Sequence, residues 1–119
     1  MLFVALGLMA AGCQRHQAPQ PTVGDLDAMG LPESAQLVAF TKLPSAPLLF
    51  IAGQDGRVCY AANRQVVASF QVEEGHQVYL HGGYSDGRTA TKLSLQGSTI
   101  YETSTRAAEN RLYFIPDLR

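Results

Sequence analysis

The sequence has few charged residues and no excess of either sign. Asp, Glu, Lys and Arg make up 16% of the 119 residues, and 9 basic residues stand against 10 acidic ones, for a formal net charge of −1. A nucleic-acid-binding domain typically carries a basic patch or stripe. The composition therefore excludes nucleic acid as the expected partner, and charge alone indicates no other partner.

The sequence also lacks the motifs of several enzyme classes. It contains no Gly-x-Ser-x-Gly nucleophile elbow and no glycine-rich phosphate loop. His76 and His81 lie five residues apart on an expected strand, so their side chains point to opposite faces and do not form a pair of metal ligands. Asp55 and Asp86 each precede a glycine, where an aspartate stabilises a turn. We therefore expect no catalytic residue, metal site, cofactor or small-molecule substrate.

The apolar run at the N-terminus is too short to cross a membrane. Leu2 to Ala11 is about ten residues long, about half of the ~20 that a transmembrane helix needs, and it has the length of a signal-peptide core. Ala10, Ala11 and Gly12 then precede Cys13. The pattern resembles the lipobox of bacterial lipoproteins, with Ala10 where Leu is usual. The resemblance implies that the small side chains let a peptidase draw the backbone into a narrow cleft, and that the Cys13 thiol is the nucleophile that accepts a diacylglycerol group.

The resemblance implies a location. Residues 1–12 would be a signal peptide, cleaved before Cys13, and Cys13 would carry the lipid that makes the membrane a partner. Because Gln14 rather than Asp follows the cysteine, the enterobacterial sorting rule implies the outer membrane, with the domain in the periplasm. The alternative is a buried N-terminal helix with a structural Cys13. The abrupt change in composition after Cys13 favours lipidation.

A linker is expected between the lipid and the domain. Residues 14–21 are rich in Gln and Pro and show no apolar period, so they cannot bury enough surface to order themselves. We assign residues 13–33 to the lipidated Cys13 and a flexible linker, and residues 34–119 to a single domain. Residues 23–29 are sufficient for one helical turn, with Asp25 as its cap.

Alternation of apolar and polar residues, broken by turn residues, predicts strands from Ala35 onwards. The clearest alternation spans 65–72, after an Asn63-Arg64 turn. The continuous apolar run 48–52 predicts a central strand, and Asp55-Gly56 predicts the hairpin turn that follows it. The expected fold is mainly β: a small antiparallel β-sandwich or partly open barrel of about seven strands, connected as a meander.

One cysteine and one group of exposed side chains remain to be placed. Cys59 alternates with Val58 and Tyr60 in an expected strand, so we predict that it is buried; if it were exposed, it would be free to pair with a partner chain. A partner-binding surface is predicted from side chains on the wetter face of residues 76–81 and in the loop that follows: Tyr79, His81, Tyr84, Asp86 and Arg88.

These observations favour a binding function over a catalytic one. We expect a non-catalytic accessory or interaction subunit of a cell-envelope assembly, such as a secretion, pilus or transport machine, with a protein partner. One alternative is an inhibitor of a periplasmic cell-wall hydrolase such as lysozyme, which would insert the loop 82–88 into the cleft of the enzyme. A small hydrolase or metal carrier ranks last, because it would need convergent His or Asp residues.

Overall fold

The computed structural model describes residues 21–42, 47–82 and 89–118. These residues form one helix and eight strands, arranged as two four-stranded antiparallel sheets. The elements are α1 (Val23–Ala28), β2 (Gln36–Thr41), β3 (Leu48–Ile51), β4 (Gly56–Ala62), β5 (Gln65–Val72), β6 (Gln77–Gly82), β7 (Thr91–Leu95), β8 (Ser98–Thr103) and β9 (Asn110–Pro116). The predicted antiparallel β-sandwich is confirmed, with eight strands in place of about seven.

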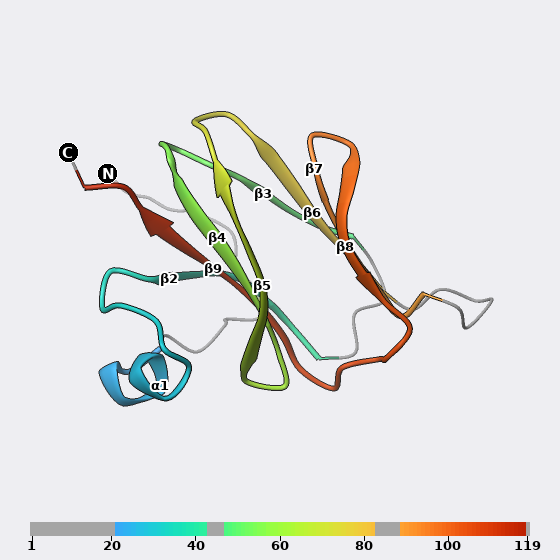
Figure 1. The fold of residues 1–119 in the computed structure, drawn as a ribbon, viewed down its shortest axis with the longest axis horizontal. Helices are drawn as coiled ribbons and strands as arrows, with labels where there is room; N and C mark the ends of the chain where they lie inside the picture. The colour runs from blue at the N-terminus through green and yellow to red at the C-terminus, as the bar shows by residue number, and fades with distance from the viewer. Residues whose placement is uncertain (1–20, 43–46, 83–88, 119) are drawn as a thin grey trace, which may run out of the picture.

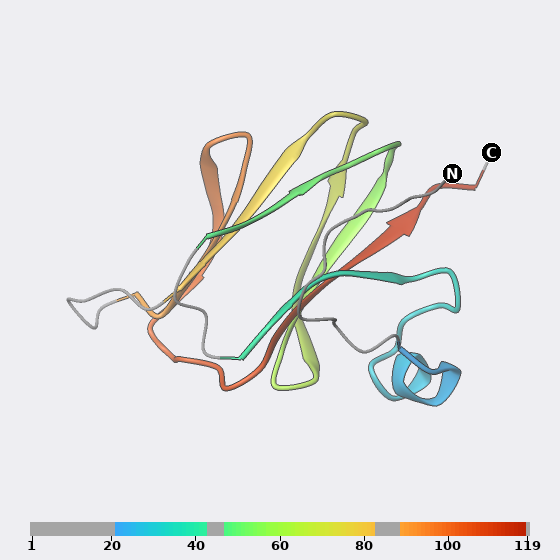
Figure 2. The same cartoon turned by 180° about the vertical axis from the view of Figure 1, so that it is seen from behind.

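The order of the strands differs from the predicted meander. The first sheet has the order β2-β9-β4-β5 and the second has the order β3-β6-β7-β8 (Figure 1; Figure 2 shows the opposite side). Only β4–β5 and the run β6–β7–β8 pair with their neighbours in sequence. The chain otherwise passes between the sheets, because each sheet has one strongly apolar face that the other sheet must cover. The meander prediction is therefore wrong for β2, β3 and β9.

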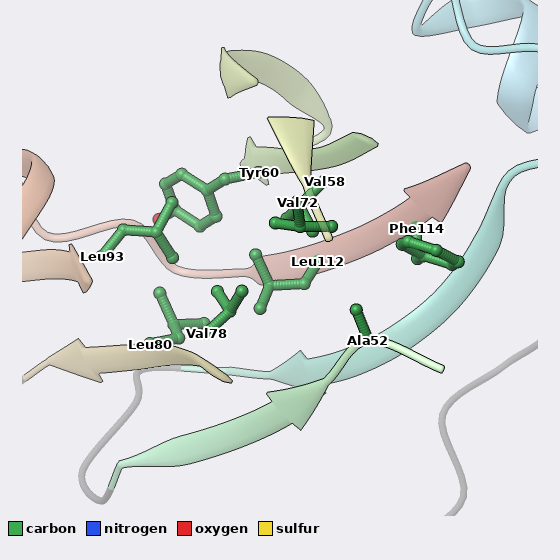
Figure 3. Packing of buried hydrophobic residues seen from close by; sticks show 9 residues of the cluster. All are labelled: Ala52, Val58, Tyr60, Val72, Val78, Leu80, Leu93, Leu112 and Phe114. Carbon is green, nitrogen blue, oxygen red and sulfur yellow. The ribbon is translucent and has the colours of Figure 1, made fainter. Parts of the chain in front are cut away.

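The main core lies between the two sheets. Alternate residues of each strand point inward, so one face of each sheet supplies the core. Figure 3 shows its nine buried members, which meet from both sheets: Ala52, Val58, Tyr60, Val72, Val78, Leu80, Leu93, Leu112 and Phe114. Burying one large aliphatic side chain stabilises a fold by about 1.5–3 kcal/mol, so this cluster supplies most of the force that holds the sheets together.

Gly56 has a different role from the one predicted. It does not close a hairpin between β3 and β4, because these strands lie in different sheets. Gly56 is the first residue of β4, and a Cβ atom built on it would lie 2.4 Å from the carbonyl oxygen of Ile115 and 2.7 Å from the ring of Phe114. Glycine is needed here because strand β9 approaches too closely for any side chain.

Strand β3 lies at an edge of its sheet, so the prediction of a central strand is wrong. It pairs with β6 on one side and, within the described residues, with no strand on the other. Leu48 and Phe50 pack against the core, whereas Leu49 and Ile51 are 46% and 53% exposed. A continuous apolar run therefore has one covered face here and not two.

The segment around α1 covers the outer face of the first sheet. Leu26, Leu31 and Ala35 pack with Cys59 and other residues of the sheet in a second buried cluster. The helical turn expected at 23–29 is present, but Thr22 is its cap: the Asp25 backbone N–H donates to Thr22 Oγ1 at 3.0 Å. Asp25 itself lies in the first turn.

These contacts change the expected boundary of the domain. Sequence analysis places residues 22–33 in the linker, and the structure instead shows that they form α1 and the turn that pack on the sheet. The physical reason is that Leu26 and Leu31 bury their apolar side chains against the sheet. The overall composition of the segment does not indicate these two buried positions. The predicted signal peptide and Cys13 lie outside the described residues. The prediction that Cys59 is buried is confirmed.

Among the described helical residues, no segment combines the length and the apolar character that a membrane crossing requires.

Candidate interaction face

The outer face of the second sheet carries Tyr79 and His81, two of the side chains that sequence analysis singled out, and both are half-buried. On β6, Val78 and Leu80 are fully buried in the core, so Tyr79 and His81 point to the opposite side. On β3, the same rule directs Leu49 and Ile51 outward. We call the surface made by Leu49, Ile51, Tyr79 and His81, together with Lys92 of β7, the β3 face.

Strand register brings these residues together. Leu49 lies directly opposite Tyr79 in the β3–β6 pair, and His81 lies opposite Lys92 in the β6–β7 pair. The Tyr79 and His81 rings are neighbours, with 5.6 Å between their centroids and an interplanar angle of 34°. The apolar edge of the sheet thus continues into a pair of rings that have polar atoms. Such side chains combine apolar contact area with the ability to form hydrogen bonds, a combination typical of protein interfaces.

The charge on this face depends on His81. Partial burial lowers the pKa of the His81 imidazole below 6.5, and the positive charge of Lys92 lowers it further. Glu102 of β8 lies opposite Lys92 on its other side. At neutral pH His81 is therefore uncharged, and Lys92 and Glu102 lie opposite each other next to the apolar part of the face.

Three predicted site residues cannot be placed on this face. Tyr84, Asp86 and Arg88 lie outside the described residues. The structure brings together Tyr79 and His81 and adds Leu49 and Ile51, which sequence analysis did not include. Their signal was the absence of any polar residue from the run 48–52, which sequence analysis interprets as a strand covered on both faces.

The four edge strands differ in composition. The exposed positions of β2, β5 and β8 include Gln, Ser, Thr or Glu, whereas β3 reads Leu-Leu-Phe-Ile. Natural sheets usually protect an edge with charges, prolines or bulges, because free backbone N–H and C=O groups pair with other strands. β2 and β8 each take part in a pair with a register shift, and β3 pairs with β6 without one. Edge β3 is the one best suited to pair with an additional strand.

Metal ligation finds no support in the described part of the chain, where no three His, Cys, Asp or Glu side chains gather closely enough to hold an ion. Comparison with known proteins adds no relative: the chain matches no family model, no curated protein and no solved structure.

Proposed function

We propose that this protein is a lipoprotein of the bacterial outer membrane, anchored through Cys13 on the periplasmic side, whose β domain binds a partner protein of an envelope assembly without catalysis. The observation that carries the binding part of the proposal is the apolar edge strand β3, which pairs on one side only among the described residues, with Leu49 and Ile51 exposed beside Tyr79. The anchoring part is supported by the run of small residues before Cys13.

The proposed mode of binding is addition of a strand. An extended segment of the partner pairs its backbone with the free edge of β3, and main-chain hydrogen bonds supply affinity. Alternate side chains of that segment lie over the β3 face, because side chains in a strand alternate between its two sides. Leu49 and Ile51 then lose water-exposed surface, which favours partner segments with apolar residues at every second position.

The binding part is tested by crosslinking in the native envelope. A photoreactive amino acid at position 49 should capture one protein, and the crosslink should map to an extended segment of that protein. To test substitutions at the edge, the photoreactive amino acid is placed at position 79. Leu49→Lys or Ile51→Lys should then abolish the crosslinked product, because a lysine on an edge strand blocks pairing with a further strand.

The matched control is Val67→Lys. Val67 is 40% exposed on β5, in the other sheet, so its replacement should leave the crosslink unchanged. Equal loss from all three variants, or no product at position 49, would contradict binding at β3. A product formed only from position 84, with a cell-wall hydrolase, would favour the inhibitor alternative.

The anchoring part is tested separately. The wild-type protein should incorporate labelled palmitate, and Cys13→Ser should not. Mass spectrometry of the native protein should find the mature chain beginning at an acylated Cys13. An unmodified thiol with residues 1–12 still attached would overturn the lipoprotein assignment.

A further inference from the structure

A cavity of about 550 Å³ lies on the opposite side of the molecule from the β3 face. It opens between the turn that follows α1 and the outer face of the first sheet, where β9, β4 and β5 run side by side. This volume falls within the range of small-molecule sites, which is about 300–1,000 Å³. None of the residues of the β3 face lines this cavity.

One wall of the cavity is apolar. Met29 and Leu31 form it from the turn after α1, and Val66 and Ile115 form it from the sheet. Cys59 also lines the cavity, and this residue is only 4% exposed. Burial raises the pKa of the Cys59 thiol, which keeps it neutral at pH 7. This part of the cavity suits a hydrocarbon chain.

The remaining lining is polar and contains one cation. The Arg57 guanidinium donates a hydrogen bond to Ser69 Oγ at 3.3 Å, across the β4–β5 pair. Ser69 engages one of its nitrogens, and a guanidinium has five N–H donors, so a planar set remains for a bidentate partner. Asp117 is the other charged residue of the lining, and Gln71 adds an amide.

We propose that this cavity binds a medium-chain fatty acid or a similar amphipathic carboxylate. The hydrocarbon chain lies against Met29, Leu31 and Ile115, and the carboxylate accepts hydrogen bonds from Arg57. An Arg–carboxylate pair is strong and directional when it is bidentate, and the apolar wall supplies the rest of the binding free energy. Asp117 opposes a carboxylate by like-charge repulsion, so it limits the affinity.

The first test is calorimetric titration with decanoate. Decanoate should bind the wild-type protein with one molecule per chain, and decyltrimethylammonium, which has the same chain and the opposite charge, should bind at least about tenfold more weakly. Arg57→Gln should weaken decanoate binding by about tenfold. Arg106→Gln is the matched control, because Arg106 is exposed and does not line the cavity. Asp117→Asn should strengthen binding.

A second readout uses Cys59. Decanoate should slow the alkylation of Cys59 by iodoacetamide in the wild-type protein, and much less in Arg57→Gln at the same concentration. Equal binding of the anion and the cation, or wild-type affinity in Arg57→Gln, would overturn the proposal. An absence of both heat and protection would overturn it as well. Arg57 is exposed, so its replacement should not prevent folding, which circular dichroism verifies.

Discussion

At the scale of single residues, one polar pair is buried between the sheets. The Tyr60 hydroxyl donates a hydrogen bond to Asn110 Oδ1, and the Asn110 amide donates to the Ala107 carbonyl at 3.4 Å. Tyr60 and Asn110 are both fully buried. A buried polar atom that loses its partner costs more than the hydrogen bond contributed, so the two residues constrain each other.

We predict that Tyr60→Phe destabilises the protein by about 1–3 kcal/mol, because it leaves Asn110 Oδ1 without the Tyr60 hydroxyl in a site that water does not reach. The free energy of unfolding in urea measures the effect. Tyr79→Phe on the outer face is the control and should change it by less than about 0.5 kcal/mol. Equal effects of the two variants would show that the buried hydroxyl contributes nothing beyond an exposed one.

His81 makes stability depend on pH. Burial first and Lys92 second lower its pKa in the folded protein below 6.5, so the unfolded chain binds a proton before the folded one does. Above pH 6.5, the contribution of neutral His81 to the free energy of unfolding is complete. This contribution decreases as the pH falls from 6.5 to the pKa of His81 in the folded protein, and it changes no further at lower pH.

We therefore predict that the wild-type protein loses more stability than His81→Gln between pH 7.5 and pH 5, as measured by urea unfolding at each pH. Lys92→Gln should reduce the difference but not remove it, because burial is the larger cause. Parallel pH profiles for the wild type and His81→Gln would exclude His81 as the source.

At the scale of secondary structure, the β4–β5 hairpin shows how one turn residue can hold two parts of the sheet. Asn63 and Arg64 have φ values of 51° and 67°, the left-handed region that two-residue hairpin turns require. The Asn63 side chain also accepts hydrogen bonds from the backbone N–H groups of Ala108 and Glu109, at 2.9 and 3.0 Å. The turn therefore holds the chain that leads into β9.

We predict that Asn63→Ala costs about 1–3 kcal/mol of unfolding free energy, because it removes the acceptor of two backbone N–H groups and places a less tolerant residue at positive φ. Asn63→Gly should cost less, since it removes only the acceptor, and Asn63→Asp should lie nearest to the wild type. The denaturant midpoints of the three variants give the order. If Gly and Ala cost the same, the backbone conformation of Asn63 carries no strain.

At the scale of the whole molecule, the first sheet is covered on both of its faces. The second sheet covers its inner face, and α1 with the following turn covers part of its outer face. Strand β9 lies at the centre of this arrangement, between β2 and β4, and its first five residues are buried. The N-terminal segment is thus part of the folding unit.

We predict that Leu26→Ala destabilises the protein by about 2–4 kcal/mol and accelerates alkylation of Cys59, because Leu26 is 3% exposed and belongs to the cluster that covers this thiol. Val23→Ala on the same helix is the control, since Val23 is 53% exposed. Unfolding in urea and the alkylation rate are the two measurements. If both variants behave alike, the helix does not stabilise the sheet.

Part of the candidate site was predictable because its signal is local. Tyr79 and His81 were assigned to one face from the alternation on a single strand, and the structure places them on that face. Leu49 and Ile51 were missed, because a short apolar run reads the same whether one or both of its faces are covered. The cavity near Arg57 was missed because the residues that form it are far apart in the sequence.

The sequence by itself determined where the strands lie and, for the clearly alternating strands such as β5 and β6, which side faces the core. These properties follow from the side-chain period of two and from turn residues such as Asn63, which act over a few residues. Only the tertiary structure decided that β3 pairs with β6, that β9 inserts between β2 and β4, and that α1 covers the first sheet. Pairing joins backbone groups that every residue has, so the choice of partner depends on how all the apolar faces are buried at once.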